Sequence, residues 1–191
     1  RSQARKKLGR DRSRPGGKAK QCRCDGGADS GCLSACDQNI VSIKRGGFMS
    51  GFIYTRRVEF ADTDMAGIMH FSSIFRFMES AEHAFFRSLG YSVTLNDIDP
   101  RLGLPRVRAE ADFRRPFRFE DEIEIEFTVR EKRRKSLTYG FELRKVGDPE
   151  RFVAAVGSIT VVCVRRNEDG KMASHELPPE LVDRIDVSNP K

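Results

Sequence analysis

One long helical pattern, followed by strand patterns without a second long helix, constrains the fold of this chain more than any other feature. Apolar residues recur at three- and four-residue steps from Ser72 to Leu89, which predicts an amphipathic helix that ends before Gly90. Many of these residues are phenylalanines, so we expect the helix to be buried over much of its surface. The preceding stretch, residues 52–60, ends in alternation and predicts a first strand.

Four further strands are predicted after this helix. The patterns cover residues 104–113, 122–131, 136–145 and 152–165. The first of the four is the weakest, and Gly147-Asp148-Pro149 forms the turn between the last two. One helix and a run of antiparallel strands predict an α+β domain, in which a sheet curves around a single buried helix.

The positive charge of the chain is concentrated at its start. The whole chain has 35 Lys and Arg against 28 Asp and Glu, and residues 1–48 have 12 against 4, which leaves 23 against 24 for residues 49–191. The basic character therefore belongs to the leading segment. We expect no nucleic-acid partner for the rest of the chain.

Residues 1–48 are predicted to be a disordered basic leader, because they have too few apolar residues to offset the entropy of ordering. A mis-assigned start ahead of Met49, a cloning remnant and a transit peptide are the explanations considered. The segment holds four cysteines, Cys22, Cys24, Cys32 and Cys36, but their spacing lacks the paired C-x2-C of zinc ribbons. The remainder divides into a domain, residues 49–178, and a polar C-terminal tail, residues 179–191, in which a short helix can form.

Cys163 is the one cysteine after the leader, and it lies in an apolar run. A lone buried thiol argues against a disulfide scaffold and fits a reducing compartment. The longest apolar run is well short of the ~20 residues that a membrane span needs. We therefore expect a cytoplasmic protein without a membrane span.

The candidate catalytic residues lie in the segment between the first strand and the helix. This segment, residues 58–71, has the sequence VEFADTDMAGIMHF and is called here the Asp loop. Its layout holds Asp64 near a helix start, where backbone N–H groups and the helix dipole favour developing negative charge. Loop carboxylates such as Asp62 and Asp64 also commonly cap helices or form Asx turns. A second signal is a run of five cationic residues between Arg130 and Lys135.

The Asp loop closely resembles the Asp-x-Asp-x-x-Gly loop of hot-dog-fold acyl-CoA thioesterases of the 4-hydroxybenzoyl-CoA thioesterase family. The resemblance covers residues 52–178. It implies that Asp64 is the catalytic carboxylate, either as a nucleophile that forms a mixed anhydride or as a general base on water. It also implies that no metal or redox cofactor is required, and that the active site lies between subunits of a homodimer or homotetramer.

The same resemblance assigns the other site residues. Gly103 is implied as a backbone N–H donor to the oxyanion, because the family uses a glycine at a helix start. Phe71 stands where many relatives have tyrosine or histidine, so its side chain can line the substrate pocket but cannot donate a hydrogen bond. His70 could take over that catalytic role, although a lone histidine there is more often a cap. Glu79 is the alternative catalytic carboxylate.

The cationic run also has a counterpart in the family. Arg133, Arg134, Lys135 and Ser136, called here the basic turn, match the segment that contacts the nucleotide phosphates of coenzyme A.

The predicted function is hydrolysis of an acyl-CoA thioester to a free acid and coenzyme A. One alternative of the same fold is an acyl-thioester hydratase, which needs a histidine paired with a carboxylate, and the candidates are His70, His83 and His175. Another is a non-catalytic acyl-thioester-binding module, against which the presence of Asp64 argues. The acyl group is left open.

Overall fold

Strands that pair antiparallel make up most of the described fold. The computed structural model describes residues 41–43 and 51–187. In chain order the elements are β1 Val41–Ile43, β2 Phe52–Arg57, the 3-10 turn η1 Phe60–Asp62, α1 Ser73–Ser88, β3 Leu102–Gly103, β4 Arg106–Phe113, β5 Glu122–Lys132, β6 Ser136–Lys145, β7 Val153–Val162, β8 Val164–Arg166, β9 Met172–Ser174 and α2 Pro179–Val182.

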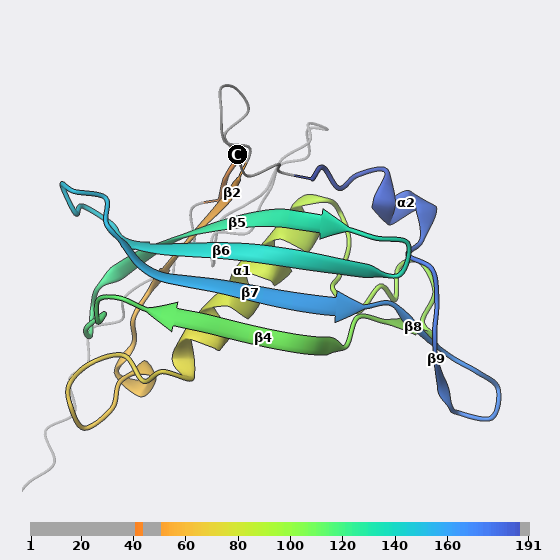
Figure 1. The fold of residues 1–191 in the computed structure, drawn as a ribbon, viewed down its shortest axis with the longest axis horizontal. Coiled ribbons are helices and arrows are strands. Elements are labelled where there is room, and N and C mark those ends of the chain that lie inside the picture. The colour runs from red at the N-terminus through yellow and green to blue at the C-terminus, as the bar shows by residue number, and fades with distance from the viewer. Residues whose placement is uncertain (1–40, 44–50, 188–191) are drawn as a thin grey trace, which may run out of the picture. The chain divides into compact units, whose positions relative to one another are not determined.

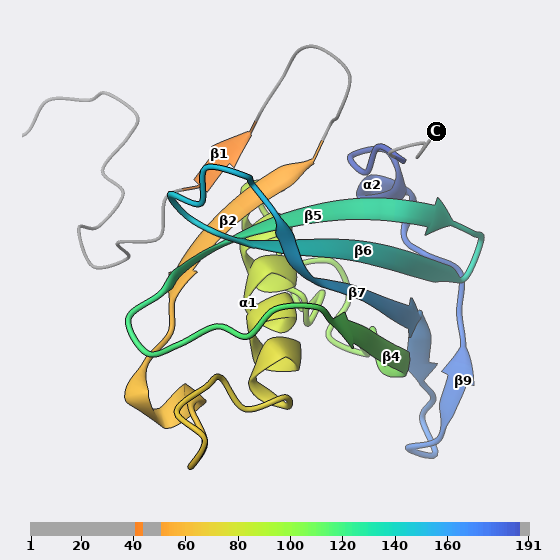
Figure 2. The same cartoon turned by 60° about the vertical axis from the view of Figure 1, so that its left-hand side comes forward.

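Six of these strands form one sheet in the order β1-β2-β5-β6-β7-β4, and every neighbouring pair is antiparallel. The helix α1 lies against one face of this sheet (Figures 1 and 2). The short strands β3, β8 and β9 form a second, three-stranded sheet. The predicted α+β architecture, with one long helix on an antiparallel sheet, is confirmed.

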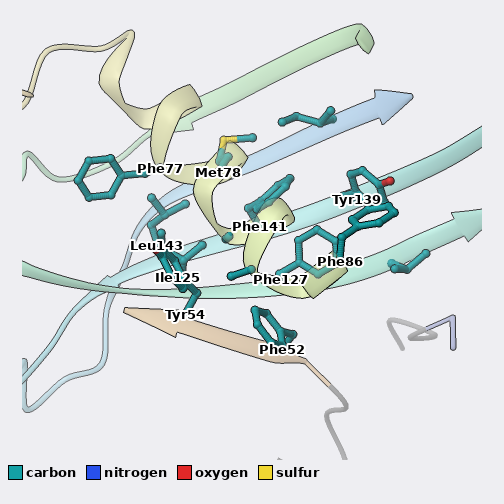
Figure 3. Packing of buried hydrophobic residues seen from close by; sticks show 14 of the residues in the cluster. Phe52, Tyr54, Phe77, Met78, Phe86, Ile125, Phe127, Tyr139, Phe141 and Leu143 are labelled. Carbon is teal, nitrogen blue, oxygen red and sulfur yellow. The ribbon is translucent and has the colours of Figure 1, made fainter. Parts of the chain in front are cut away.

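The core lies between α1 and the large sheet (Figure 3). Phe127 of β5 is almost fully buried, and its ring lies 4.5 Å from that of Phe85, 5.0 Å from Tyr139 and 5.3 Å from Phe141, centroid to centroid. Gly157 of β7 lets the helix approach closely, because a Cβ at that position would lie 2.5 Å from Cε of Met78. Aromatic packing on α1 therefore matches the buried helix that the sequence predicted.

Two predicted strands end differently in the structure. The strand expected over residues 52–60 stops at Arg57, and the exposed Phe60 starts η1, so the alternation at its end belongs to a turn. The strand expected over 152–165 is split into β7 and β8. The split falls at the buried Cys163, where the chain leaves the large sheet and β8 pairs with β3 instead.

One segment of the leader differs from the expectation. β1 lies inside residues 1–48, for which disorder was predicted, and it pairs with the outer edge of β2. The remainder of the leader, including its four cysteines, lies outside the described residues, as does Met49.

At the other end of the chain the short helix α2 is present. Leu177, Leu181 and Ile185 are buried in the core. Lys132 donates to the backbone carbonyls of Val182 and Ile185 at 2.9 and 2.8 Å. The segment up to Ile185 is therefore packed onto the domain. No helix among residues 51–187 combines the length and the apolar character that crossing a membrane would take.

Candidate active site

The Asp loop is a closely hydrogen-bonded turn that presents Asp64. The backbone N–H of Asp64 donates to the carbonyl of Ile68 at 2.9 Å, and Thr63 and Met69 form a bridge across the loop. Gly67 reverses the chain with a φ of 72°, a left-handed conformation that other residues avoid. The half-buried Asp64 accepts the N–H of Ala66 at Oδ1, at 2.8 Å, whereas Oδ2 accepts no hydrogen bond from the described residues. One carboxylate oxygen is thus held in place and the other is available.

Asp62 holds the Asp loop together through its side chain and its backbone. Its side chain is buried, with Oδ1 3.1 Å from Arg76 Nη2 and Oδ2 accepting the N–H of Glu59 at 3.1 Å. Its backbone carbonyl accepts the N–H of His70 and the hydroxyl of Ser73, at 2.8 and 3.0 Å. Asp62 therefore fixes the Asp loop on the first turn of α1.

His70 caps the helix start. Its Nδ1 lies 2.7 Å from Oγ of Ser72 and accepts the Ser72 backbone N–H at 3.4 Å. An N–H can donate only to an unprotonated ring nitrogen, so this geometry places the proton of a neutral His70 on Nε2. The Phe71 ring lies 4.5 Å from the His70 ring and is 63% exposed, so it is free to contact a ligand.

The Phe71 backbone N–H is a candidate oxyanion donor that the sequence analysis did not identify. It donates to no acceptor among residues 51–187, whereas the N–H groups of His70 and Ser73 on either side of it bond to the carbonyls of Asp62 and His70. An open N–H at the start of a helix suits a developing oxyanion. Phe71 lies one residue before Ser72, the N-cap of α1, so the sequence alone does not show that its N–H lacks an acceptor.

Gly103 was predicted as an oxyanion donor because the family has a glycine at a helix start, and the structure does not place it at one. It lies in β3, paired with Val164 of β8, and not at a helix start. An added Cβ would meet only Cγ2 of Val164, at 3.8 Å, so packing does not require a glycine here. The segment before β4 is extended because it pairs with β8.

The basic turn joins β5 to β6 and is exposed. The Arg133 and Arg134 side chains are 70% and 74% exposed, and they pair with Glu131 at 2.7 Å and Glu176 at 3.4 Å. Lys135 Nζ donates to Ser174 Oγ at 3.2 Å. Surface pairs of this kind contribute little, so these cations remain available to an anionic ligand. The neighbouring Lys132 donates to the backbone carbonyls of Val182 and Ile185, so it does not belong to this group of available cations.

A single chain keeps the predicted site residues at opposite ends of the sheet. The Asp loop is bonded to the segment just before β5, with Met69 N–H donating to Phe117 O and Val58 N–H to Asp121 O, both at 2.8 Å. The basic turn follows the other end of β5, whose 11 residues span roughly 35 Å at about 3.3 Å each (Figure 1). Gly103, which pairs with β8, shares that far end.

Two surface cavities do not include these residues. One of about 380 Å³ is lined by residues that include Arg115, Phe117 and Phe152, and one of about 530 Å³ by residues that include His83 and Tyr91. Neither is lined by Asp64.

An antiparallel sheet on one long helix, with a carboxylate loop at the helix start and an exposed basic turn, defines a thioester hydrolase of the hot-dog fold. A family model described as "Thioesterase-like superfamily" matches residues 58–185, and the chain belongs to this family. The predicted family, fold and class are confirmed, and the chain is an acyl-CoA thioesterase.

Named relatives agree with this assignment. A 1,4-dihydroxy-2-naphthoyl-CoA hydrolase of Prochlorococcus marinus is 31% identical over 96 residues, which are 47% of this chain and 64% of that protein. A gentisyl-coenzyme A thioesterase of known structure is 32% identical, with a TM-score of 0.58, over 68% of this chain and 98% of that one. A 4-hydroxybenzoyl CoA thioesterase has a TM-score of 0.63 at 20% identity, over 71% and 99%, and supports the fold alone.

Proposed function

We propose that this chain hydrolyses an aromatic acyl-CoA thioester with Asp64 as the catalytic carboxylate. The observation that carries the proposal is the pairing of a half-free carboxylate with an open N–H, that of Phe71, at the start of the same helix. The two named relatives above 30% identity act on 1,4-dihydroxy-2-naphthoyl-CoA and gentisyl-CoA, which are both aromatic thioesters. The exposed Phe71 ring beside the Asp loop suits an aromatic acyl group.

Two routes use this geometry. As a general base, Asp64 takes a proton from water, and the water oxygen attacks the thioester carbon. As a nucleophile, Oδ2 attacks that carbon, and water later cleaves the mixed anhydride. In both, the carbonyl oxygen becomes an oxyanion that accepts the Phe71 N–H, and the carbon–sulfur bond breaks to release the thiolate of coenzyme A. Nε2 of His70 is the ring nitrogen left for proton transfer, because Nδ1 is engaged by Ser72.

Coenzyme A is proposed to bind through its phosphates at the basic turn. Arg133, Arg134 and Lys135 supply the charge and the donors there, and Ser136 supplies a hydroxyl. Because the length of β5, roughly 35 Å, lies between the basic turn and the segment that holds the Asp loop, the two parts come from different chains in this proposal.

A second copy of the chain can supply the part of the active site that one chain does not bring together. β4 is one of the two edge strands of the large sheet, opposite β1, and all of its residues except the half-buried Ala111 are exposed. An antiparallel copy of β4 beside it would bring the basic turn of that copy to the Asp64 end of the first. In such a pairing Arg108 can stand opposite Glu110 or Asp112, which favours the contact. We therefore propose a homodimer, or a homotetramer built from it, located in the cytoplasm, where the buried thiol of Cys163 stays reduced.

The hydratase alternative has weaker support. His83 Nε2 lies 3.9 Å from Oε1 of Glu79, but that oxygen is also paired with Arg106 at 3.0 Å. The non-catalytic alternative predicts binding of the thioester without its consumption.

The test of the reaction is the loss of thioester absorbance from a panel of aromatic and aliphatic acyl-CoAs. The full chain is compared with Asp64→Asn and with Asp169→Asn, which makes the same change on an exposed turn. We expect hydrolysis, fastest with aromatic thioesters, to fall at least about 100-fold in Asp64→Asn only, a loss of about 2.7 kcal/mol. Equal activity of the two variants would remove Asp64 from the mechanism, and binding without turnover would favour the non-catalytic alternative.

The shared site has its own test. One variant carries Asp64→Asn and another carries Arg133→Ala with Arg134→Ala, each weakly active alone at low substrate concentration. Mixed under exchange conditions, they should form heterodimers in which one of the two sites is intact, which restores about a quarter of the wild-type activity. If mixing restores nothing, each site is built from one chain.

A further inference from the structure

A β-bulge at the start of β4 turns Arg106 toward α1. Residues two apart on a regular strand share a face, yet Arg106 stands opposite Val161 and Arg108 opposite the preceding residue of β7, Thr160. Val107 is therefore an extra residue, and the two arginines lie on opposite faces of the sheet. Val161 is buried in the core, so Arg106 is on the helix side, whereas Arg108 pairs with Glu110 at 2.7 Å on the other face.

Two carboxylates of α1 bind this arginine. Nη2 of Arg106 lies 2.6 Å from Oε2 of Glu82 and 3.0 Å from Oε1 of Glu79. The two partners differ in environment, since the Glu82 side chain is 0% exposed and the Glu79 side chain is 43% exposed. The Glu82 carboxylate is thus shielded from water, although the Arg106 side chain is 33% exposed, while the contact with Glu79 is screened by water on both sides.

The buried position of Glu82, between α1 and the large sheet, costs free energy of folding. Its Oε1 accepts no hydrogen bond, and the buried hydroxyl of Tyr139 on β6 makes none, within the part of the chain that the structure describes. Burial raises the pKa of Glu82, the Arg106 guanidinium opposes that shift, and Glu79 adds to it. Burial, followed by the charge of Glu82, raises the pKa of Tyr139 well above its usual value. An apolar residue at position 82 would stabilise the domain more than the Glu82–Arg106 ion pair does. The presence of this ion pair therefore needs another explanation.

We propose that Glu82 is a positioning residue that fixes the start of β4 on α1, through Arg106, and thereby aligns the edge at which a second copy completes the active site. The inference rests on the assembly in the proposed function. Apolar packing gives β4 little support, because every residue of the strand except Ala111 is exposed. The regular part of its edge, residues 108–113, begins directly after the bulge, so the direction of that edge follows from where Arg106 is held.

The experiment compares Glu82→Gln with Glu79→Gln in the full chain. Glutamine keeps the size of each side chain and removes its charge, and both positions contact the same nitrogen of Arg106. Sedimentation equilibrium gives the dissociation constant of the dimer, thermal unfolding gives Tm, and thioester hydrolysis is followed over a range of protein concentrations. Arg106→Gln breaks the same contact from β4 and serves if Glu82→Gln does not fold.

We expect Glu82→Gln to raise the dissociation constant at least tenfold without lowering the Tm measured at protein concentrations where both proteins are monomeric, and Glu79→Gln to change the dissociation constant less than threefold. Hydrolysis by Glu82→Gln should fall at low protein concentration and recover at high concentration, with KM unchanged. The double variant Glu82→Gln with Arg106→Gln should dissociate no more readily than either single variant.

An unchanged dissociation constant in Glu82→Gln, equal effects of the two glutamine variants, or a monomeric wild-type chain would each overturn the inference. A wild-type dimer that hydrolyses no thioester, but that dissociates when Glu82 is changed, would overturn the proposed function and leave the positioning role standing.

Discussion

The same substitution at Asp62 and at Asp64 should separate the fold from the chemistry of the Asp loop. In Asp62→Asn, one oxygen and one NH2 group replace two oxygens that accept from Glu59 N–H and Arg76. One of these donors must then face the NH2 group inside a site that is only 2% exposed. A buried donor without an acceptor costs about 1–3 kcal/mol, and the weakened pairing with Arg76 and Arg56 adds to this, for a total of about 2–3 kcal/mol.

Asp64→Asn should leave the fold intact. The asparagine oxygen can keep the bond from Ala66 N–H, and the NH2 group takes the place of Oδ2, which has no partner in residues 51–187. The expected change in unfolding free energy is below about 0.5 kcal/mol. The activity should fall at least about 100-fold, because an amide neither attacks the thioester nor takes a proton.

Calorimetry and hydrolysis of the preferred acyl-CoA measure the two effects. For a domain of this size, 2–3 kcal/mol corresponds to a fall in Tm of roughly 10 °C. Below its Tm, Asp62→Asn should keep activity within about tenfold of wild type. A Tm within about 2 °C of wild type in Asp62→Asn, or activity above a tenth of wild type in Asp64→Asn, would refute this division of roles.

Three further outcomes follow from the same contacts. Arg133→Ala and Arg134→Ala should each raise KM for acyl-CoA about three- to tenfold at low salt with little change in kcat, and a thioester without the nucleotide should show no effect. Phe127→Ala should destabilise the domain by about 3–5 kcal/mol, seen in urea unfolding, because the ring is buried among three others. Burial raises the pKa of Glu82, so its contribution to stability is complete below the usual carboxyl pKa and is lost as pH rises through the raised value. Glu82→Gln should therefore gain stability relative to wild type as pH rises above the usual carboxyl pKa, and a difference that stays constant with pH would contradict the shift.

The long elements could be predicted because their patterns are local. The helix expected from Ser72 to Leu89 is α1, Ser73–Ser88, and the strand expected over residues 136–145 is β6. Strands of two or three residues, such as β3 and β9, carry too little periodicity to be seen in the sequence. They form because β8 leaves the large sheet and needs partners on both sides.

The site was predicted less completely than the fold, for the same reason. The geometry of Asp64 follows from residues close to it in sequence, and the loop could be recognised from them. The donor was placed at Gly103 because the sequence does not show whether a glycine starts a helix or lies in a strand. The burial of Glu82 could not be foreseen either, since its partner Arg106 reaches it only through a bulge 24 residues later.

The packing of the chain's last described segment sets the timing of folding on the ribosome. Leu181 and Ile185 are buried in the core, and the carbonyl of Ile185 is bonded to Lys132 at the end of β5. A nascent chain whose residues beyond 177 are still inside the exit tunnel can pair its strands, but it leaves this part of the core open to water. In a growing chain the core is therefore complete only after Leu181 and Ile185 have left the exit tunnel and packed onto it.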